Sequence, residues 1–303
     1  MGQTPQATSN NQSNTTSAYQ DAPATPHEVA IQNIDPQPPS EPLSLWYTTP
    51  ATNWVREALP IGNGDMGAMI LGGVAQDRIQ FNHKTLWKGT SQPTDLGSYL
   101  PFGDIYITNL NAKNATNYRR CLNLRTAVAD VQYDADGECY TREYLCSNPD
   151  KVVAIRYKAK HARNLSLSIN LINAQGLRAT YTTKGATFSG TLTNGMAYAA
   201  TMRVCHKAGR VTATSEGIEI DRAKEVVIFL TCTTNFVPTQ TNHLAGNVPQ
   251  IMANINSTVQ AASNKGFERV MSRHIKDHAQ LFNRVNFTLQ GAKNTQPTNL
   301  LLT

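Results

Sequence analysis

Between residue 45 and about residue 236, the sequence is a succession of short runs rich in β-branched and aromatic residues, separated by Gly, Asn and Asp. Residues 78–81 (RIQF), 164–171 (NLSLSINL) and 225–230 (EVVIFL) are examples. Runs of this length that are bounded by turn residues are typical of strands in a sandwich. No apolar pattern of helical period interrupts them. The sequence therefore predicts a mainly β fold, with a large antiparallel β-sandwich over residues 44–240.

Asp136 and Gly137 form a two-residue signal for a type I′ turn, which fixes the register of a β-hairpin. Counting outward predicts strands over about 126–135 and 138–147, with Tyr133 opposite Tyr140. The face that carries these two tyrosines also carries the following residues and is the expected core side: Ala127, Ala129, Val131, Arg142, Tyr144 and Cys146. On the other face, Asp130 lies opposite Glu143, where the two like charges repel unless they are solvated or bridged by a cation. A second turn is expected at 193–195 (TNG).

The period of the apolar residues changes near Asn247, which can cap a helix that has Pro249 in its first turn. Apolar residues then recur every three or four positions, at Ile251, Ile255, Val259 and Ala262. Gly266 ends this helix. A second helix is expected to present one broad stripe made of Phe267, Val270, Met271, His274, Ile275, His278, Leu281 and Phe282. Residues 241–290 are thus predicted to be a short two-helix linker with a returning strand at 285–289.

The two histidines of this second helix are four residues apart and could share a metal ion in principle. The run HIKDH lacks the glutamate after the first histidine that a zinc protease helix requires, and no third ligand is evident. Packed or surface histidines are the favoured interpretation. The five cysteines show no CxxC pair and no metal-ligand spacing, so we expect no metal site and no cofactor.

Both ends of the chain are polar. Residues 1–43 are dominated by Gln, Asn, Ser, Thr and Pro and are expected to form a flexible leader, while residues 291–303 form a polar tail. No stretch approaches 18 apolar residues, so no membrane span is predicted. No signal peptide is visible, which leaves the compartment open, and a periplasmic or secreted location is compatible with a missing leader sequence.

The net charge is +6, but the basic residues are scattered and the longest basic runs are pairs such as Arg119–Arg120. Nucleic-acid binding proteins usually present a clustered basic stripe or a recognised motif. The basic balance is therefore interpreted as a property of a solvated surface, and no nucleic-acid partner is expected.

The segment LPIGNGDMGAMILGG contains Gly62, Gly64 and Gly67 at the spacing of a dinucleotide-binding turn. That motif requires a buried strand before it and a helix after it. Here Pro60 precedes the glycines, and the run 68–71 that follows them reads as a short strand. The acid expected about 20 residues further on is replaced by Trp87. The glycines are better explained by a turn that leads into a strand, in which Asn63 and Asp65 tolerate left-handed backbone.

Four segments together resemble glycoside hydrolase family 95, which contains α-L-fucosidases and some α-L-galactosidases. They are residues 57–89 (EALPIGNGDMGAMILGGVAQDRIQFNHKTLWKG), 97–107 (GSYLPFGDIYI), 117–157 (NYRRCLNLRTAVADVQYDADGECYTREYLCSNPDKVVAIRY) and 274–289 (HIKDHAQLFNRVNFTL). They follow the order of the family and extend the match from about residue 45 to residue 289. The resemblance implies an N-terminal β-sandwich of the supersandwich type, followed by a helical linker, an (α/α)6 barrel and a C-terminal β domain.

The same resemblance places the catalytic groups of the family, a general-acid glutamate and the asparagine and aspartate residues that activate water, on the barrel. The matched segments stop where that barrel begins, so the chain is expected to be truncated before it. We therefore expect no catalytic residue, and we expect the chain alone to be inactive as an α-L-fucosidase. The partners that the resemblance implies are the missing barrel and, in the full-length enzyme, a fucosylated glycan. One departure from the family pattern is His83, which stands where the family usually has an acid.

Asn63, Asp65, Asn82 and Trp87 are the candidate residues for contact with substrate or for docking of the barrel, and the loop from Asn82 to Gly89 is the expected docking surface. Asp65 and Asp104 are interpreted as acids that cap turns. The alternative function is a stand-alone carbohydrate-binding or interaction module that uses Trp46, Trp54 and Trp87. Packing in the core or between domains is the favoured explanation for these tryptophans.

Overall fold

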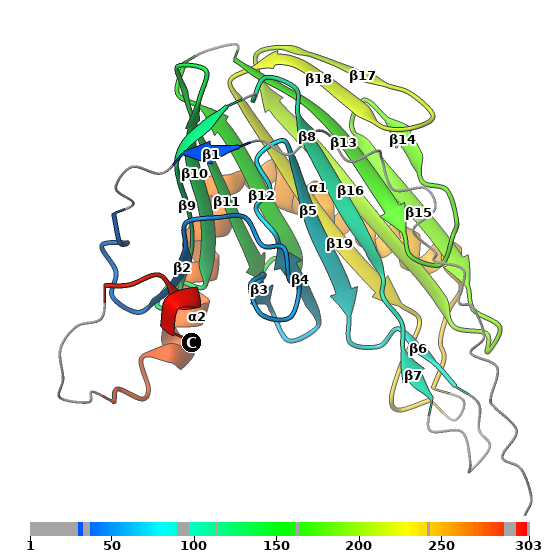
Figure 1. Ribbon diagram of the computed structural model, residues 1–303. Helices are drawn as coiled ribbons and strands as arrows, with labels where there is room; N and C mark the ends of the chain where they lie inside the picture. The colour runs from blue at the N-terminus through cyan, green and yellow to red at the C-terminus, as the bar shows by residue number, and fades with distance from the viewer. Residues whose placement is uncertain are drawn as a thin grey trace, which may run out of the picture.

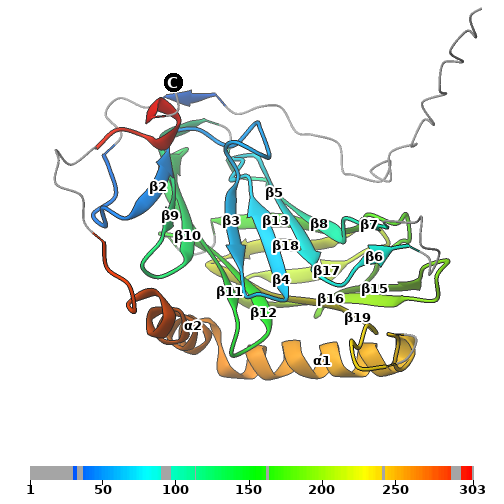
Figure 2. The ribbon, with the colours of Figure 1, turned by 90° about the horizontal axis from the view of Figure 1, so that it is seen from below.

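The computed structural model describes residues 30–32, 37–89, 97–112, 114–161, 164–240, 243–287 and 295–301. Two large sheets pack face to face, with two helices on the outside of the larger one (Figures 1 and 2). In the described residues the pairing of β1 with β9 is parallel, and every other strand pair is antiparallel. The predicted mainly β antiparallel sandwich is confirmed.

The strands of the larger sheet, in spatial order, are β1 (Ile31–Gln32), β9 (Ala115–Asn123), β10 (Val128–Ala135), β11 (Glu138–Ser147), β12 (Val152–Ala159), β19 (Glu225–Thr234), β16 (Ala197–Lys207), β15 (Gly185–Thr191) and β14 (Thr180–Thr182), and β2 (Ser44–Tyr47) also pairs with β9. The smaller sheet contains β17 (Arg210–Ala213), β18 (Ile218–Ala223), β13 (Leu165–Asn173), β8 (Gly103–Asn109), β5 (Gln76–His83), β4 (Met66–Ile70) and β3 (Leu59–Gly62). A separate pair consists of β6 (Trp87–Lys88) and β7 (Ser98–Tyr99).

The core lies between the two sheets and follows from the alternation along each strand. In β5, for example, Asp77, Ile79 and Phe81 are buried, while their neighbours are partly exposed. Burying a large apolar side chain of this kind stabilises the fold by about 1.5–3 kcal/mol relative to leaving it in water. Phe81 packs with Phe102 and Phe188 between the sheets.

The hairpin of β10 and β11 has the register expected from its turn. Asp136 and Gly137 both have positive φ, 51° and 78°, as a type I′ turn requires. Tyr133 lies opposite Tyr140, and their ring centroids are 5.2 Å apart. Asp130 also lies opposite Glu143 as predicted. Gly195, in the second predicted turn, has a φ of 85° and lies between β15 and β16.

The two helices are α1 (Val248–Lys265) and α2 (Phe267–Phe282), which cover the face of the larger sheet that points away from the smaller one (Figure 2). Asn247 caps α1 through a reciprocal capping box with Gln250, and Pro249 lies in the first turn. The predicted apolar positions Ile251, Ile255, Val259 and Ala262 are all buried, and Gly266 separates the helices with a φ of 78°. These boundary predictions hold because caps and breakers act locally.

The apolar stripe of α2 is shorter than predicted. Phe267, Val270 and His274 are buried, but Leu281 is 62% exposed, because the C-terminal half of the helix contacts the turn between β9 and β10 rather than the middle of the sheet. His274 and His278 contact the backbone carbonyls of Ala127 and Leu124 through Nε2, at 3.1 and 2.9 Å. They are packing histidines.

The turn between β11 and β12 holds both helices through Asp150, whose side chain is fully buried. Its carboxylate contacts Lys265 Nζ at the end of α1 at 3.2 Å and Arg273 Nε in α2 at 3.1 Å. Ser147 Oγ donates a hydrogen bond to the same carboxylate. One side chain thus links the corner between the helices to the sandwich.

The polar ends are less uniform than the sequence suggests. Most of the predicted leader lies outside the described residues, but Ile31–Gln32 forms β1 beside β9, so the leader is not wholly without regular structure. Residues 285–287 are irregular rather than part of a returning strand, and residues 288–289 lie outside the described part. In the predicted polar tail, Thr298–Leu301 forms a short 3-10 helix, and Thr298 Oγ1 accepts a hydrogen bond from the backbone N–H of Trp46.

Candidate functional site

The glycine-rich segment forms the β-hairpin of β3 and β4 rather than a nucleotide-binding loop. Gly62 pairs with Gly67 across the hairpin, and no helix follows. Pro60 is accommodated because β3 is the last strand of its sheet, where one edge needs no donor. In the turn, Asn63 Oδ1 accepts hydrogen bonds from the backbone N–H groups of Asp65 and Met66, and Asn63 Nδ2 donates one to Ser147 O. Asn63 therefore fixes the turn against the end of β11.

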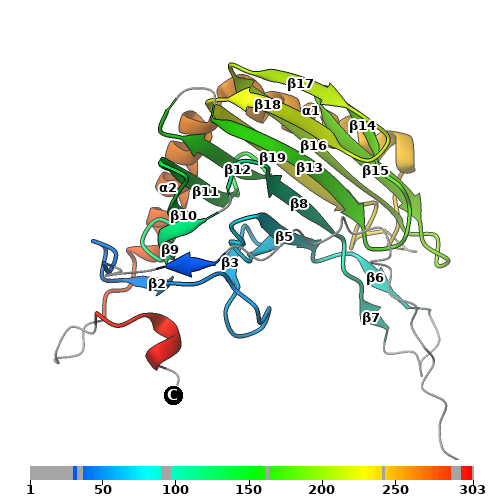
Figure 3. The same ribbon diagram turned by 45° about the horizontal axis from the view of Figure 1, so that its top comes forward.

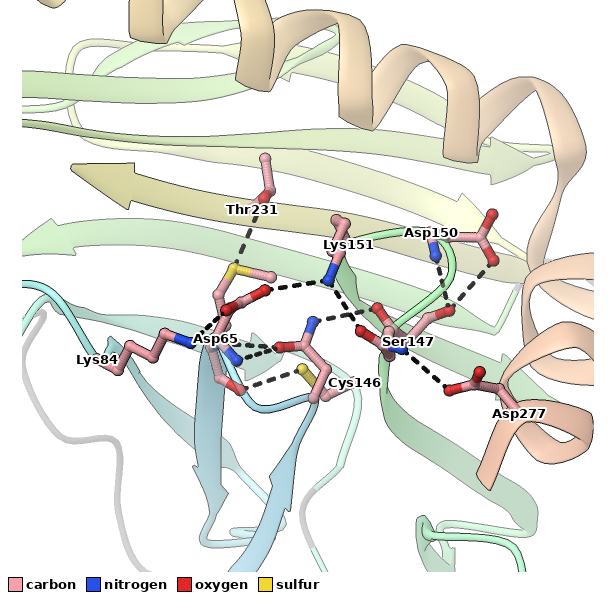
Figure 4. A network of polar contacts seen from close by, with 11 residues as sticks. Asp65, Lys84, Cys146, Ser147, Asp150, Lys151, Thr231 and Asp277 are labelled. Carbon is pink, nitrogen blue, oxygen red and sulfur yellow. Dashed lines mark hydrogen bonds and ion pairs between the residues drawn. The ribbon is translucent and has the colours of Figure 1, made fainter. Parts of the chain in front are cut away.

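Asp65, at the tip of this turn, lies between two lysines (Figure 4). Its carboxylate accepts from Lys84 Nζ at 2.7 Å and from Lys151 Nζ at 3.0 Å. The hydrogen bonds from these two lysines lower the pKa of the Asp65 carboxyl to about 2. At neutral pH Asp65 is ionised, so it is unsuited to donate a proton, and the three side chains together carry one net positive charge.

His83 follows in β5, at the position paired with Met66. Its Nδ1 accepts a hydrogen bond from the backbone N–H of Thr85, which leaves the proton of the neutral ring on Nε2. Burial lowers the pKa of His83 to about 4, so the ring is neutral at physiological pH. Thr85 in turn contacts Thr234 through their hydroxyl groups, which connects the two sheets.

Asn63, Asp65 and His83 line a pocket of about 360 Å³ between the hairpin tip, the end of β19 and α1. Polar lining groups are Asn63, Asp65, His83, Lys151, Thr231, Thr233, Thr234, Asn235, Asn254 and Thr258. Met66, Cys232, Val237, Ala245, Ile251 and Ile255 complete the lining. Imidazole apart, no aromatic side chain contributes to it, which removes the usual stacking surface for a sugar ring.

The four candidate residues do not form one site. Asn63 and Asp65 line the pocket, and Asn82 lies beside it, opposite Gly67 in the ladder. Trp87 does not line the pocket. It lies in β6, which forms a projecting pair with β7 (Figure 3). The rings of Trp87 and Tyr99 make an edge-to-face contact, with centroids 4.4 Å apart. Sequence reasoning missed His83 as a lining residue, together with Lys84 and Lys151 as partners of Asp65.

The described residues offer little for acid–base chemistry. They contain no group of three or more His, Cys, Asp or Glu side chains that could hold a metal ion. Asp130 is a carboxyl whose pKa is raised, to about 6, mainly by burial and also by Glu143 opposite. It lies on the outer face of β10 near Arg119, and Glu143 is paired with Arg156. This carboxylate pair lies outside the pocket, and each acid pairs with its own arginine, Arg119 for Asp130 and Arg156 for Glu143, rather than sharing one bridging cation.

A buried polar cluster inside the sandwich was also missed by sequence reasoning. Asp77 accepts hydrogen bonds from the hydroxyl groups of Tyr144 and Tyr157 and from the backbone N–H of Gly72. Arg142 Nη1 lies 3.7 Å from Asp77, and its guanidinium donates to Tyr133 and to the carbonyls of Gly73 and Val74. The predicted hairpin register already placed Arg142 on the core face. Because a buried guanidinium requires a partner, this position indicated that a buried acid lies nearby.

The interpretation of Asp104 as a turn-capping acid is wrong. Asp104 lies within β8, fully buried, and pairs with Arg78 Nε at 2.7 Å. The buried phenylalanine and glycine before it belong to the strand entry rather than to a turn. Asp65, by contrast, does lie in a turn, although its carboxylate binds lysines instead of capping the backbone.

The fold is a β-sandwich with helices on one outer face, and the match to a family model places the chain in the class of N-terminal domains of glycoside hydrolases. It belongs to the family described as "Glycosyl hydrolase family 65, N-terminal domain", whose model matches residues 45–96 and 91–239. The resemblance to a glycoside hydrolase N-terminal domain is thus confirmed at this level.

Among curated proteins, the chain is 26% identical to "Alpha-L-fucosidase 2" of Arabidopsis thaliana, over 87% of this chain and 38% of that protein. It is 24% identical to "Probable alpha-fucosidase A" of Aspergillus niger, over 86% of this chain and 40% of that protein. The chain spans about two fifths of the length of these relatives. A solved structure described as "Putative kojibiose phosphorylase from human microbiome" shares the fold, with a TM-score of 0.51 and 13% identity over 82% of this chain and 39% of that one. In the part of the chain that is described, no helix is long and apolar enough to cross a membrane.

Proposed function

We propose that this chain acts as the non-catalytic N-terminal sandwich of a family 95 hydrolase of the α-L-fucosidase type, with catalysis performed by a helical barrel. The substrate of the whole enzyme would be a fucosylated glycan. The names of the two curated relatives support the substrate class. The chain matches only 38% and 40% of their length, which supports the proposal that catalysis belongs to another domain.

The observation that carries the proposal is the state of Asp65, the carboxylate in the pocket. Inverting glycosidases need one carboxylic acid with a raised pKa and one carboxylate base, about 6.5–9.5 Å apart. Asp65 has its pKa lowered to about 2 and is held by two lysines. No second carboxylate lines the pocket. The pocket therefore suits contact with a partner domain better than proton transfer to a sugar.

An activity assay on the purified chain tests the proposal. We expect no turnover of an aryl α-L-fucoside above the rate of the uncatalysed reaction. Sequencing of the coding DNA beyond Thr303 is the companion test, and an in-frame barrel is the expected result. Fucosidase activity that persists through purification, and that is lost on Asp65→Asn or on replacement of another carboxylate within residues 45–290, would overturn the non-catalytic role.

A stand-alone carbohydrate-binding module is the second candidate, and the projecting pair of β6 and β7 is the observation that favours it. Tyr99 is 64% exposed and meets Trp87 edge to face, which is a geometry available for stacking on a sugar. Titration of L-fucose against tryptophan fluorescence, with Tyr99→Ala as the matched variant, tests this function. A saturable change that Tyr99→Ala removes would favour the module.

A further inference from the structure

The larger sheet has an internal gap at the pocket. Strand β12 begins at Val152, and its last pairing with β19 joins Val153 to Leu230. Strand β19 continues for four more residues, to Thr234, and these pair on their other side with β16. Lys151, with a φ of 53°, turns the chain away before it can extend the ladder. Within the described residues, no strand lies beside residues 231–234 of β19 on the β12 side.

Some backbone N–H and C=O groups of β19 point toward this gap. In an antiparallel sheet, the backbone N–H and C=O groups of successive residues point alternately to the neighbouring strand on one side and to the strand on the other side. The N–H of Asn235 donates to the carbonyl of Ala197, the first residue of β16, so the odd-numbered residues of β19 bond toward β16. Cys232 and Thr234 therefore direct their backbone groups toward the pocket, and we call this the open edge of β19. The N–H of Cys232 confirms the direction, because it contacts Met66 Sδ at 3.2 Å.

The acceptor at the open edge is Met66 Sδ, which also accepts from Thr231 Oγ1 at 3.6 Å. A thioether sulfur is a weak hydrogen-bond acceptor, and methionine is an unbranched side chain that adapts readily to its surroundings. A peptide carbonyl in the place of Met66 Sδ would make a stronger bond with Cys232. Unpaired strand edges are templates for the addition of another strand.

The positive charge at the entrance of the pocket favours a peptide with an acidic side chain. Lys84 and Lys151 are more than half exposed, at 59% and 54%, and they share the single carboxylate of Asp65. The mouth thus carries one uncompensated positive charge, because His83 is neutral at physiological pH. An acidic side chain that enters here would pair with a lysine without meeting a second carboxylate of the lining.

We propose that the open edge of β19 accepts an extended peptide segment that carries an acidic side chain, bound by strand addition between β19 and the hairpin tip of β3 and β4. The main chain of the peptide pairs with Cys232 and Thr234, and its carboxylate contacts Lys84 or Lys151. The site lies in the same pocket that is proposed to contact a partner domain, but its ladder and charges belong to this chain whatever the activity of the whole enzyme.

The test uses the full chain and a blocked pentapeptide, acetyl-Thr-Asp-Val-Asp-Thr-amide. Titration followed by amide chemical shifts should show saturable changes at Asp65, His83, Lys151 and residues 232–234, and not along the edge strands β14 and β17. The same peptide methylated on its three central amides should bind at least tenfold more weakly, because it cannot donate to the edge. This comparison leaves the protein unchanged, so it does not depend on the folding of a variant.

A charge swap supplies the protein-side test. The double variant Lys84→Glu/Lys151→Glu should weaken binding of the acidic peptide at least tenfold and should improve binding of acetyl-Thr-Lys-Val-Lys-Thr-amide. Lys184→Glu, at an exposed lysine of the loop between β14 and β15, is the matched control and should leave both affinities nearly unchanged.

Three results would overturn the proposal. They are absence of binding of the acidic peptide at millimolar concentration, equal binding of its methylated form, and shifts confined to other sheet edges. Displacement of the peptide by L-fucose with shifts at the same amides would instead identify a sugar site. Failure of the proposal would leave the fucosidase assay unaffected.

Discussion

Two carboxylates of this sandwich are each held by cations, one inside the core and one at a pocket mouth. Asp77 is fully buried and receives two tyrosine hydroxyls, a backbone N–H and the nearby guanidinium of Arg142. Asp65 is 37% exposed and receives two lysines whose ammonium groups reach into water. The first has planar, fixed partners, and the second has flexible ones.

This difference separates a group that determines the fold from a group available for recognition. Removing one member of a buried charged cluster leaves an uncompensated charge in a medium of low dielectric constant. Removing one member of an exposed pair is largely compensated by water. The stability of the protein should therefore respond strongly to changes at Asp77 and Arg142 and weakly to changes at Asp65.

The largest effect is expected from Arg142→Met, which removes the guanidinium and leaves Asp77 without its cation. The free energy of unfolding should fall by about 3–5 kcal/mol, measured by urea denaturation near neutral pH. Arg125→Met, at the exposed pair with Glu41, is the matched control and should cost less than about 1 kcal/mol. Equal effects of the two substitutions would erase the distinction between the two kinds of site.

A smaller effect is expected when the acid of the buried cluster is neutralised as well. In the double variant Asp77→Asn/Arg142→Met, neither charge remains, and the asparagine oxygen can still accept from Tyr144 and Tyr157. The double variant should be more stable than the sum of the two single changes predicts, by about 1–3 kcal/mol. Additive costs would mean that the two residues do not act as a unit.

The buried His83 of the pocket should make the stability of the protein depend on pH. The pKa of His83 falls from its ordinary value of 6.5 to about 4 on folding, because burial disfavours the charged ring. The unfolded chain therefore binds more protons than the folded chain between these values, so the stabilising effect of this group is complete above pH 6.5 and is lost as pH falls toward 4. The loss should reach at most about 3 kcal/mol.

Urea denaturation of the wild type and of His83→Gln, at about pH 7.5 and pH 4.5, measures this contribution. The variant should lose less stability on acidification than the wild type does. If both lose the same amount, the acid sensitivity arises elsewhere.

The smallest effect on stability is expected from Asp65→Asn. The partly exposed ion pairs with Lys84 and Lys151 should contribute less than about 1 kcal/mol, and the turn retains the backbone contacts made by Asn63. The same change adds one positive charge at the pocket mouth, so it should strengthen binding of the acidic pentapeptide. A cost as large as that of Arg142→Met would show that Asp65 is a structural residue.

Local signals in the sequence were enough for the elements that depend on neighbours along the chain. The Asp136–Gly137 turn determines the register from Tyr133 to Tyr140, and Asn247 with Pro249 marks the start of α1. Each of these signals acts over a few residues, so no knowledge of the rest of the fold is required.

The sites could not be predicted in the same way because their members lie far apart in the sequence. Asp77 and Arg142 are brought together only when β5 faces β10 and β11 across the core. Lys151 reaches Asp65 only because the β11–β12 turn lies beside the β3–β4 turn. Asp104 was misinterpreted for the same reason, since the preceding Pro-Phe-Gly suggests a turn while Arg78 on the neighbouring strand holds the acid in β8.

Asp150 gives the corner at Gly266 the properties of a fixed joint. Helix α2 has 16 residues, which corresponds to a length of ~24 Å at 1.5 Å per residue. A tilt of only 10° about Gly266 would displace its far end by ~4 Å, more than the length of a hydrogen bond. The carboxylate of Asp150 binds Lys265 on one side of that corner and Arg273 on the other, so it limits such a tilt. The orientation of α2 is therefore fixed relative to the sandwich.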